Sequence, residues 1–562
     1  MSELAKVFST DVLIIGGGIS GLCAANKAAD QGADVLITDK STTGWCGQMP
    51  ASGGAFTCPP TPDMIEAQVK FYVKEGEYLN DQEWTYTFVR DTFPCIEEMS
   101  QWGLPFHTDS AGRLDLGRAG GTARCTRAEM ALPTLLGRVL RKGARVLNKV
   151  YMVNLLKRDG RIVGAFGFHY QTGDAYIVQS KATIICSGGC NYKSRPLFHI
   201  NCGEGVAIAY DAGAEIRNAE FANHFMVSNK FTLNNTSPPG PDLFENALGE
   251  SLVSKYPEMN HLQDPSTPPW LTRAIHNRWV LAWYKEIEAS RGPIYCNLIG
   301  RPERTVGFGD SVRIPDLTHG YVNTMKSLGI DLMKEKVEWK IVPEFHAGPI
   351  RVDTNCETTL PGLYATGDAV QNGSAYWGAR EGCGLPSPLS FAMVTGFRAG
   401  RAAGKAVSSL PETELDTGEV DRLKEEMFAP LAVKDGFSPY DAIKEIQAVV
   451  FKLKNSYIKH NDRLQNALSM TEKIKAKLPD LMAKDSHELV RCHEARSMAT
   501  NAELLYRASL MRTETRGTNI REDYPERDDK NWLKWIIITK EGEKMKLSTE
   551  PVPIDKYKYR PD

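Results

Sequence analysis

Three glycines near the start of the chain have a spacing that can bind a pyrophosphate group. Gly16, Gly18 and Gly21 form the pattern G-x-G-x-x-G. In this pattern the first glycine makes a tight turn, the second lets the backbone approach a phosphate, and the third lets a helix pack closely on a strand. Asp39 closes the next apolar segment, where its carboxylate can accept hydrogen bonds from ribose hydroxyl groups. The four residues together predict a dinucleotide-binding site.

The segments around these glycines predict the strand–helix–strand unit that such a site requires. Residues 12–15 are apolar and indicate a buried strand, residues 22–29 indicate a helix of small residues, and residues 34–38 indicate a second strand. The first turn of that helix offers unpaired N–H groups and the positive end of the helix dipole to phosphates. A glycine-rich turn without a ligand is the alternative, but the order of strand, helix and acidic residue favours the dinucleotide site.

The overall composition excludes several other classes of protein. The chain has 562 residues, enough for roughly three or four domains. Its net charge of −2 creates no field that would favour nucleic acid or an anionic membrane. The sequence has no apolar run of about 18 residues, so no transmembrane helix is predicted, and residues 1–10 do not resemble a signal peptide. The twelve cysteines are scattered and none forms C-x-x-C, so we expect a reducing cytoplasmic location and no metal or iron–sulfur ligand set in this chain.

The rest of the chain alternates between loops, strands and helices. Residues 41–56 are rich in glycine, serine and threonine and predict a loop that can bring backbone N–H groups, Trp45 and Cys46 to a flavin ring. A tryptophan in a loop is more often simply packed. Residues 144–156 and 161–186 predict a small antiparallel sheet. Helices are predicted within residues 62–102, 127–140, 269–290, 396–407 and, with amphipathic patterns, throughout 410–530.

Four later segments resemble the flavoprotein subunits of the succinate dehydrogenase and fumarate reductase family, which also includes L-aspartate oxidase and the adenylylsulfate reductase flavoprotein. Residues 201–221 are similar to the family's N-T-G-D-G segment, and residues 345–353 to its H-x-T-M-G-G-I-x-V-D strand. Residues 360–369 resemble the flavin-binding G-L-Y-A-A-G-E, and residues 512–529 the C-terminal R-x-E-S-R-G-x-H-x-R-x-D. The segments follow the family's order and span essentially the whole chain.

This resemblance implies an α/β fold in which a Rossmann-like FAD-binding domain, residues 1–221 and 341–408, is interrupted by an α+β capping domain, residues 222–340. A helical domain at 409–530 and a C-terminal tail at 531–562 follow. The loop at 41–47 lacks the histidine that carries covalent flavin in respiratory relatives, so the resemblance implies non-covalent FAD. With the fingerprint, it implies a cofactor site formed by Gly16, Gly18, Ile19, Ser20, Gly21, Asp39, Lys40, Gly47, Gly53, Gly54, Ser187, Gly188, Gly367, Asp368, Ser387 and Leu389.

The resemblance also implies residues that hold a substrate. His346 matches a histidine that binds the substrate carboxylate in the family, and Arg380 resembles the arginine that clamps it. A guanidinium suits this task because it forms a two-pronged hydrogen bond with a carboxylate and keeps its charge. The spacing departs from the family, with one residue missing before Arg380 and with Pro386 and Pro388 added. An ordinary packed histidine and a structural arginine are the alternatives.

Candidates for a proton donor lie in residues 270–279, WLTRAIHNRW. The family uses an arginine in S-R-D-x-x-x-R, and Arg273 and Arg278 have the same separation. A count back from Arg291 instead places His276 nearest the donor position. An arginine can transfer protons only where it is desolvated beside a base, so ordinary charges on a helix surface are the alternative.

Other departures separate the chain from the best-known members of the family. The family's Q-F-H-P-T is absent, and His224 stands one position away from its histidine. Residues 223–225 and 292–298 look closer to adenylylsulfate reductase, yet the arginine that this enzyme uses has no match near Lys230. We therefore expect a divergent member, closest to the adenylylsulfate reductase flavoprotein, that acts on another small anionic substrate.

The source of electrons follows from what the sequence offers. One dinucleotide fingerprint is present and no nicotinamide site is evident, so NAD(P)H is not expected as the direct donor. A ferredoxin-like iron–sulfur partner subunit is expected instead, as in many members of the family. The favoured function is fumarate reductase-like transfer of a hydride or electrons between FAD and a small anionic substrate. Reduction of a sulfur substrate, a flavin electron-transfer subunit without its own substrate, and L-aspartate oxidase are the alternatives.

Overall fold

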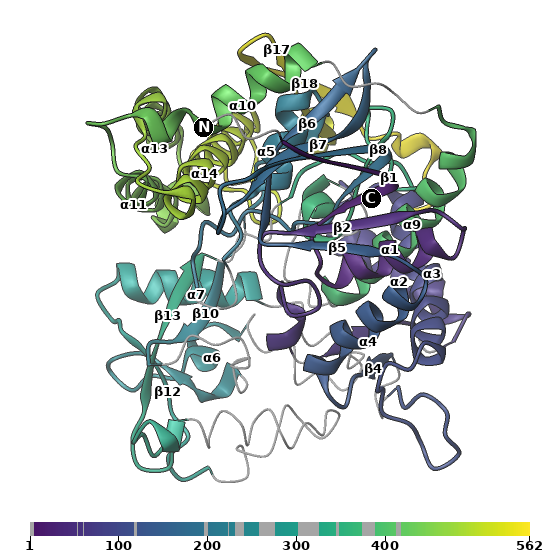
Figure 1. The fold of residues 1–562 in the computed structure, drawn as a ribbon. Coiled ribbons are helices and arrows are strands. Elements are labelled where there is room, and N and C mark those ends of the chain that lie inside the picture. Colours follow the sequence, from purple (N-terminus) through teal and green to yellow (C-terminus); the bar gives the residue numbers. More distant parts are fainter. Residues whose placement is uncertain are drawn as a thin grey trace.

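The computed structural model describes residues 5–52, 54–59, 61–116, 121–195, 200–222, 224–230, 241–257, 276–301, 325–343, 348–373, 388–411 and 417–561. Its centre is a seven-stranded sheet with the strand order β5-β2-β1-β8-β7-β6, in which β14 also pairs with β8 (Figure 1). The strands are β1 (Lys6–Ile15), β2 (Val35–Asp39), β5 (Arg145–Asn148), β6 (Val150–Arg158), β7 (Arg161–His169), β8 (Ala175–Ile185) and β14 (Leu363–Ala365).

The sheet is parallel in one part and antiparallel in the other, and β8 joins the two parts. β1 pairs in parallel with β2 and β8, and β2 pairs in parallel with β5. β7 lies antiparallel between β6 and β8. The antiparallel pairing expected within residues 144–156 and 161–186 is thus present in β6, β7 and β8, but these strands continue the central sheet, and β5 pairs in parallel with β2. The strand β8 pairs with β1 along one edge and with β7 and β14 along the other.

Two helices from distant parts of the chain pack backbone to backbone beside this sheet. They are α1 (Ile19–Ala29) and α9 (Pro388–Ala406). A Cβ atom at Gly396 would lie 2.4 Å from a backbone oxygen atom of α1, and one at Gly400 would lie 2.1 Å from another. Glycines four residues apart share one face of a helix. The glycines of α9 thus allow a contact that any side chain would prevent.

The remaining elements of this central region cover the sheet and its edges. They are α2 (Met64–Glu75), α3 (Gln82–Gln101), α4 (Ala128–Arg141), α5 (Glu204–Ala212), η7 (Gly367–Gly373), and the paired strands β3 (Ala55–Thr57) and β4 (Thr122–Arg124).

A second region contains a four-stranded antiparallel sheet in the order β10-β13-β12-β11. Its core holds Trp283, whose ring centroid lies 4.9 Å from that of Phe244, and Trp339, which lies 5.3 Å from the same ring. Its helix α7 falls inside the range predicted for a helix at 269–290. The elements are β10 (His224–Ser228), β11 (Phe244–Glu245), α6 (Leu252–Lys255), α7 (His276–Glu288), β12 (Ile294–Cys296) and β13 (Val337–Pro343).

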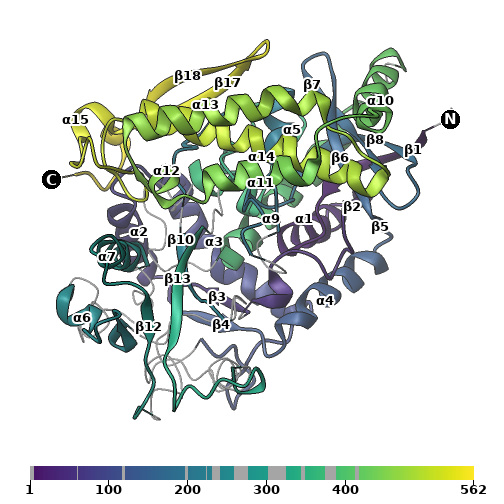
Figure 2. The same ribbon diagram turned by 90° about the vertical axis from the view of Figure 1, so that its left-hand side faces the viewer.

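A helical region packs on the central region and lies above the four-stranded region in Figure 2. Its helices are α10 (Thr417–Ala432), α11 (Pro439–Val450), α12 (Leu453–Ser456), α13 (Asn461–Lys477) and α14 (Ser486–Met511). The long helix α14 reaches the start of α5, where the Asn501 side chain donates a hydrogen bond to the Gly203 carbonyl at 3.1 Å. Among the helices of the described residues, none has the length and apolar character needed to cross a bilayer.

The C-terminal residues, expected as a tail at 531–562, form a hairpin that extends the fold. β17 (Lys534–Glu541) pairs with β18 (Lys544–Pro551) and also with β9 (Ile216–Arg217). The indole of Trp535 is 4% exposed and donates to the Leu79 carbonyl at 2.8 Å. The apolar run Trp535–Ile538 explains the difference, because these residues are buried against the central region.

Candidate functional site

A cavity opens where the parallel strands β1, β2, β8 and β14 end and where α1 begins. Ligands of open parallel sheets bind at this edge. The cavity encloses about 1320 Å³ of space, part of it open to solvent. Of the residues predicted to bind the cofactor, those that line it are Gly16, Gly18, Ile19, Ser20, Asp39, Lys40, Gly47, Ser187, Gly188, Gly367, Asp368 and Leu389.

The three fingerprint glycines have different surroundings, which explain why each position requires a glycine. Gly16 has a φ of +114°, and a Cβ atom there would lie 2.5 Å from the Cys186 carbonyl oxygen. A Cβ atom at Gly21 would lie 1.9 Å from the Gly16 carbonyl oxygen, so this glycine sets the packing of α1 on β1. A Cβ atom at Gly18 would meet no protein atom within 4 Å. Gly18 therefore faces open cavity, as the approach of a ligand phosphate requires.

Asp39 ties the following loop to the glycine turn. One carboxylate oxygen accepts hydrogen bonds from the Gly17 N–H at 2.7 Å and from the Cys46 thiol at 3.1 Å. The other accepts from the Ser41 N–H at 2.5 Å. A carboxylate can accept about four hydrogen bonds. Three protein donors therefore fix the orientation of Asp39 and leave capacity for a ribose hydroxyl.

Both loop residues that were considered as flavin neighbours line the cavity. Trp45 is 60% exposed and borders it, as does Cys46. Burial, together with the negative charge of Asp39, raises the pKa of the Cys46 thiol well above its usual value. The thiol therefore stays protonated and acts as a hydrogen-bond donor to Asp39.

Some predicted residues lie elsewhere. A Cβ atom at Gly54, which has a φ of +61°, would lie 3.0 Å from the Ala128 side chain, so Gly54 packs against the start of α4 outside the cavity lining. Gly21 is enclosed between α1 and β1. Gly53 and Ser387 fall outside the described residues.

The residues expected to hold the substrate or to donate the proton are also outside the described residues. These are Arg273, His346 and Arg380, and His276 is described as the first residue of α7 without its side chain. Two described residues that flank these positions lie at or near the cavity. A Cβ atom at Gly348 would lie 1.9 Å from the carbonyl oxygen of Asp368, which lines the cavity. Pro388, which follows the undescribed residues around Arg380, lines the cavity itself.

His224 lies away from the cavity. It begins β10, is 2% exposed, and its Nε2 atom lies 3.3 Å from the Ser456 hydroxyl. Its ring packs edge-on against Tyr457 at 5.1 Å. These contacts place His224 at the junction of the four-stranded and helical regions, where it is a packing residue.

Several cavity residues were missed by the sequence analysis. Glu204 lines the cavity and receives a hydrogen bond from Lys40. It occupies the acidic position of N-C-G-E-G, which matches N-T-G-D-G, so the motif itself could have identified it. Tyr151 and Met152 line the cavity from β6, but a strand residue carries no local pattern that marks it as a ligand contact.

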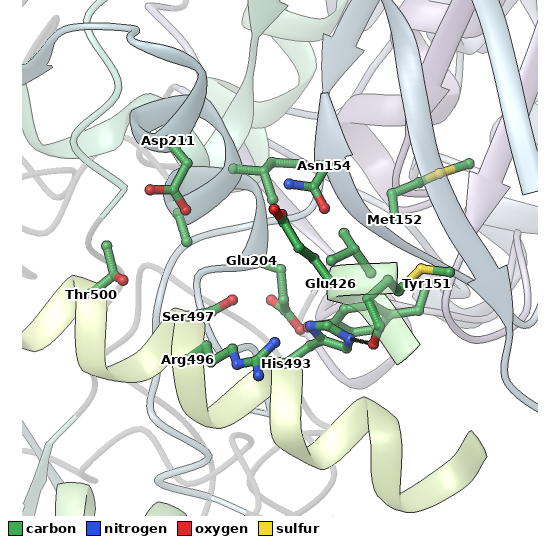
Figure 3. A pocket seen from close by; sticks show the side chains of 14 residues that line it. Tyr151, Met152, Asn154, Glu204, Asp211, Glu426, His493, Arg496, Ser497 and Thr500 are labelled. Carbon is green, nitrogen blue, oxygen red and sulfur yellow. Dashed lines mark hydrogen bonds between the residues drawn. The ribbon is translucent and has the colours of Figure 1, made fainter. Parts of the chain in front are cut away.

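A second, smaller cavity of about 610 Å³, also partly open to solvent, adjoins the first between α5, β6, α10 and α14 (Figure 3). It shares Tyr151, Met152, Glu204 and Ile208 with the larger cavity. His493 faces it and lies 3.1 Å from the Met427 carbonyl oxygen through Nε2. Burial and the charge of Arg496 lower the pKa of His493 to about 3. His493 is therefore neutral at physiological pH.

Comparison with known proteins agrees with this geometry. Residues 11–231 match the family model described as FAD binding domain, and residues 445–562 match the model described as fumarate reductase flavoprotein C-term. The chain is similar to one subunit of the fumarate reductase (CoM/CoB) of Methanothermobacter marburgensis, with 25% identity over 96% of this chain and 98% of the relative. It is also similar to the fumarate reductase flavoprotein subunit of Mycobacterium tuberculosis, with 26% identity over 97% and 98% of the two chains.

The fold is shared with two kinds of solved structure. A variant of the E. coli quinol fumarate reductase superposes with a TM-score of 0.85 at 18% identity, covering 98% of each chain. Adenylylsulfate reductase from Archaeoglobus fulgidus superposes with a TM-score of 0.78 at 20% identity, covering 99% of this chain and 97% of the other. The predicted fold class and cofactor are confirmed. The chain is an FAD-dependent oxidoreductase that combines an FAD binding domain with a fumarate reductase flavoprotein C-terminal domain, and its relatives include flavoprotein subunits of fumarate reductase and succinate dehydrogenase.

Proposed function

We propose that this protein transfers electrons between its FAD and a small anionic substrate, and that it exchanges these electrons with an iron–sulfur partner subunit. The observation that supports the proposal is the position of two described residues that flank the segments expected to hold the substrate. Gly348, two residues after His346, packs on Asp368 at the cavity wall, and Pro388 lines the same wall after Arg380.

The division of labour follows from the chemistry. FAD supplies the hydride or electron pair, and the protein must bind the substrate and move one proton. In this proposal Arg380 clamps a substrate carboxylate and His346 holds it beside the flavin. Arg273 or His276, just before or at the first residue of α7, donates the proton. The four-stranded region that contains α7 then supplies the acid, and the central region supplies the cofactor.

The partner is inferred from what this chain and its relatives share. Both named relatives are subunits, as their names state. The cysteines of this sequence form no C-x-x-C set, so iron–sulfur clusters would have to come from another chain. A one-electron relay through such a partner would supply FAD without a nicotinamide site.

The test begins with anaerobic purification of the natural complex. We expect a flavin spectrum with a broad iron–sulfur shoulder and a second, smaller chain. The Arg380→Lys and Arg380→Ala variants should then lose substrate turnover by a factor of at least about 100 while retaining FAD, because a clamp lost in the transition state costs several kcal/mol. Arg422→Ala is the control, since Arg422 is exposed and pairs with Glu426 on α10. Normal turnover of the Arg380 variants would refute the proposed role.

The substrate screen separates the remaining functions. Fumarate and related dicarboxylates test the favoured function, and adenylylsulfate tests the alternative of a sulfur substrate. The test with adenylylsulfate is included because His224 contacts Ser456 and does not take the place of the histidine in Q-F-H-P-T. An electron-transfer subunit would be indicated by two results together. The complex would carry electrons without reducing any of these acceptors, and the Arg380 variants would transfer electrons at the wild-type rate.

A further inference from the structure

A cluster of five charged residues links the FAD cavity to the helical region. Lys40 and Glu204 line the cavity and form an ion pair with each other. Glu494 of α14 lies 3.6 Å from the Lys40 amino group through one carboxylate oxygen. Its other oxygen lies 2.5 Å from the Lys193 amino group and also pairs with Arg491. We call these residues, Lys40, Lys193, Glu204, Arg491 and Glu494, the ionic cluster.

Glu494 is the centre of the ionic cluster and is almost completely enclosed. Its side chain is 3% exposed. Burial disfavours its ionised form, but the charges of Lys40, Lys193 and Arg491 outweigh this and hold the pKa of Glu494 at about 2. It is therefore a carboxylate at physiological pH. The same carboxylate and Glu204 raise the pKa of Lys40 well above its usual value, so Lys40 is a cation.

Described residues of the helical region touch the cofactor cavity only from behind its wall. None of the described residues that line the FAD cavity belongs to α10–α14. Figure 3 shows Glu204 directed from α5 toward the side of α14 that carries His493, Arg496 and Ser497. Glu204, which lines both cavities, thus connects the central region with the helical region at this point.

We propose that Glu494 is a positioning residue for FAD, which acts through Lys40 and Glu204. Glu204 is held by Lys40 and by the Cys202 N–H, which donates to it at 3.2 Å. Without Glu494, the partly buried cations Lys193 and Arg491 lose their carboxylate, and Glu204 is the other carboxylate of the cluster. Glu204 would be drawn away from the cavity wall, and Lys40 with it. The helical region thereby determines how tightly the central region holds its cofactor.

The sign of the effect separates positioning from simple electrostatics. FAD is anionic through its pyrophosphate, and the ionic cluster has a net charge of +1, from three cations and two carboxylates. If Glu494 acted on FAD through its charge alone, its removal would strengthen binding. The positioning role predicts the opposite, because a partly buried cation that loses its partner draws the remaining carboxylate toward itself.

The experiment measures the FAD affinity of the full-length apoprotein by titration of flavin fluorescence. We expect Glu494→Gln to weaken FAD binding about tenfold, equal to loss of roughly one charged hydrogen bond. Glu503→Gln is the matched control, since Glu503 is a buried carboxylate of the same helix, pairs with Lys475 and Arg507, and lies outside both cavities. Its FAD affinity should equal that of the wild type. Equal affinities of the two variants, or tighter binding by Glu494→Gln, would overturn the proposal.

A double-mutant cycle tests whether the effect passes through Lys40. In a Lys40→Met background, Glu494→Gln should change the FAD affinity less than about threefold, because the link is already broken. A full tenfold loss in that background would also overturn the proposal. If Glu494→Gln does not fold, Glu494→Asp keeps the charge for Lys193 and Arg491 and withdraws the carboxylate by one methylene. That variant should lose about threefold in affinity, and an unchanged affinity would count against the positioning role.

Discussion

The amino group of Lys459 donates a hydrogen bond to the Glu220 carbonyl oxygen at 2.6 Å, deep inside the protein. Lys459 is fully buried and also donates to Ser509 and Asn519, each at 2.8 Å. Glu220 precedes the four-stranded region, and its carboxylate pairs with Arg512 at 2.7 Å. Lys459 and Arg512 therefore fix Glu220, where the chain passes from the central region to the four-stranded sheet.

Lys459 makes the stability of the protein depend on pH in the alkaline range. Burial lowers its pKa from 10.5 to about 7; the charge of Glu220 opposes this, and Arg521 and Arg512 add to it. Between these two values the unfolded chain binds the proton more strongly than the folded protein. The free energy of unfolding should thus rise with pH from about 7 to 10, by up to ~1.4 kcal/mol per pH unit from this group.

The measurement is urea unfolding of wild type and Lys459→Met at several values of pH. Methionine has no titrating group, so the difference in unfolding free energy between the two proteins should change across this window. A constant difference from about pH 7 to 10 would show that Lys459 stays charged in the folded protein.

His493 should act in the same direction as Lys459, but in the acidic range. Its pKa is lowered from 6.5 to about 3, so below pH 6.5 the unfolded chain takes up a proton that the folded protein does not. Stability from this group is complete above about pH 6.5 and is lost as pH falls toward 3. We expect His493→Leu to show a shallower loss of unfolding free energy between about pH 6 and 4. Parallel curves for the two proteins would contradict the neutral buried state.

Gly18 and Gly21 should respond to the same substitution in different ways. Gly18→Ala adds a methyl group in open cavity, so the apoprotein should melt like the wild type but bind FAD at least about tenfold more weakly. Gly21→Ala places its Cβ atom on the Gly16 carbonyl, so we expect a loss of about 2 kcal/mol in stability even without cofactor. Thermal melting of the apoproteins and FAD titration distinguish the two. A normal FAD affinity in Gly18→Ala would place the phosphates elsewhere.

Two tryptophans offer a comparison between the tail and the cavity. Trp535 is buried, and the Arg217 guanidinium lies 4.6 Å above its ring. Trp535→Ala should destabilise the apoprotein by about 3 kcal/mol. Trp45 is 60% exposed, so Trp45→Ala should leave the melting of the apoprotein unchanged. Equal melting of both variants, measured by calorimetry, would mean that the hairpin contributes nothing to the central region.

Cys46 tests the orientation of Asp39. Cys46→Ser keeps a donor to the Asp39 carboxylate, whereas Cys46→Ala removes it. We expect the alanine variant to bind FAD about fivefold more weakly and the serine variant to match the wild type, since one hydrogen bond contributes about 1 kcal/mol. The same weakening in both variants would point to the sulfur itself.

The sequence predicts those parts of the site that depend on local spacing. Gly16, Gly18, Gly21 and Asp39 stand within one strand–helix–strand unit, so their roles can be inferred from a short segment. His224 shows the limit of such inference. Its neighbours Ser456 and Tyr457 come from a distant helix and the residue after it, and no local pattern announces that contact.

The same reasoning applies to the fold. Strands within residues 161–186 and their antiparallel pairing were predicted, but the pairing of β8 with β1 and β14 was not, because it depends on elements far away in the chain. The ionic cluster adds Lys193, Arg491 and Glu494 to the cavity residues Lys40 and Glu204, and the charges of these three residues look like ordinary surface charges in the sequence. Burial gives them their importance, and burial is decided by the packing of α14.

The glycine face of α9 has a consequence for how the protein is made. The helix α1 leaves the ribosome well before Gly396 and Gly400, which provide the backbone surface that it packs against. The strand β14, which completes the central sheet, also follows late, at Leu363–Ala365. The helix α1 therefore stays uncovered until the end of α9 at Ala406 has emerged. The cavity residues Gly367, Asp368, Pro388 and Leu389 belong to the same late part of the chain, so the four-stranded region is synthesised before the cavity is complete.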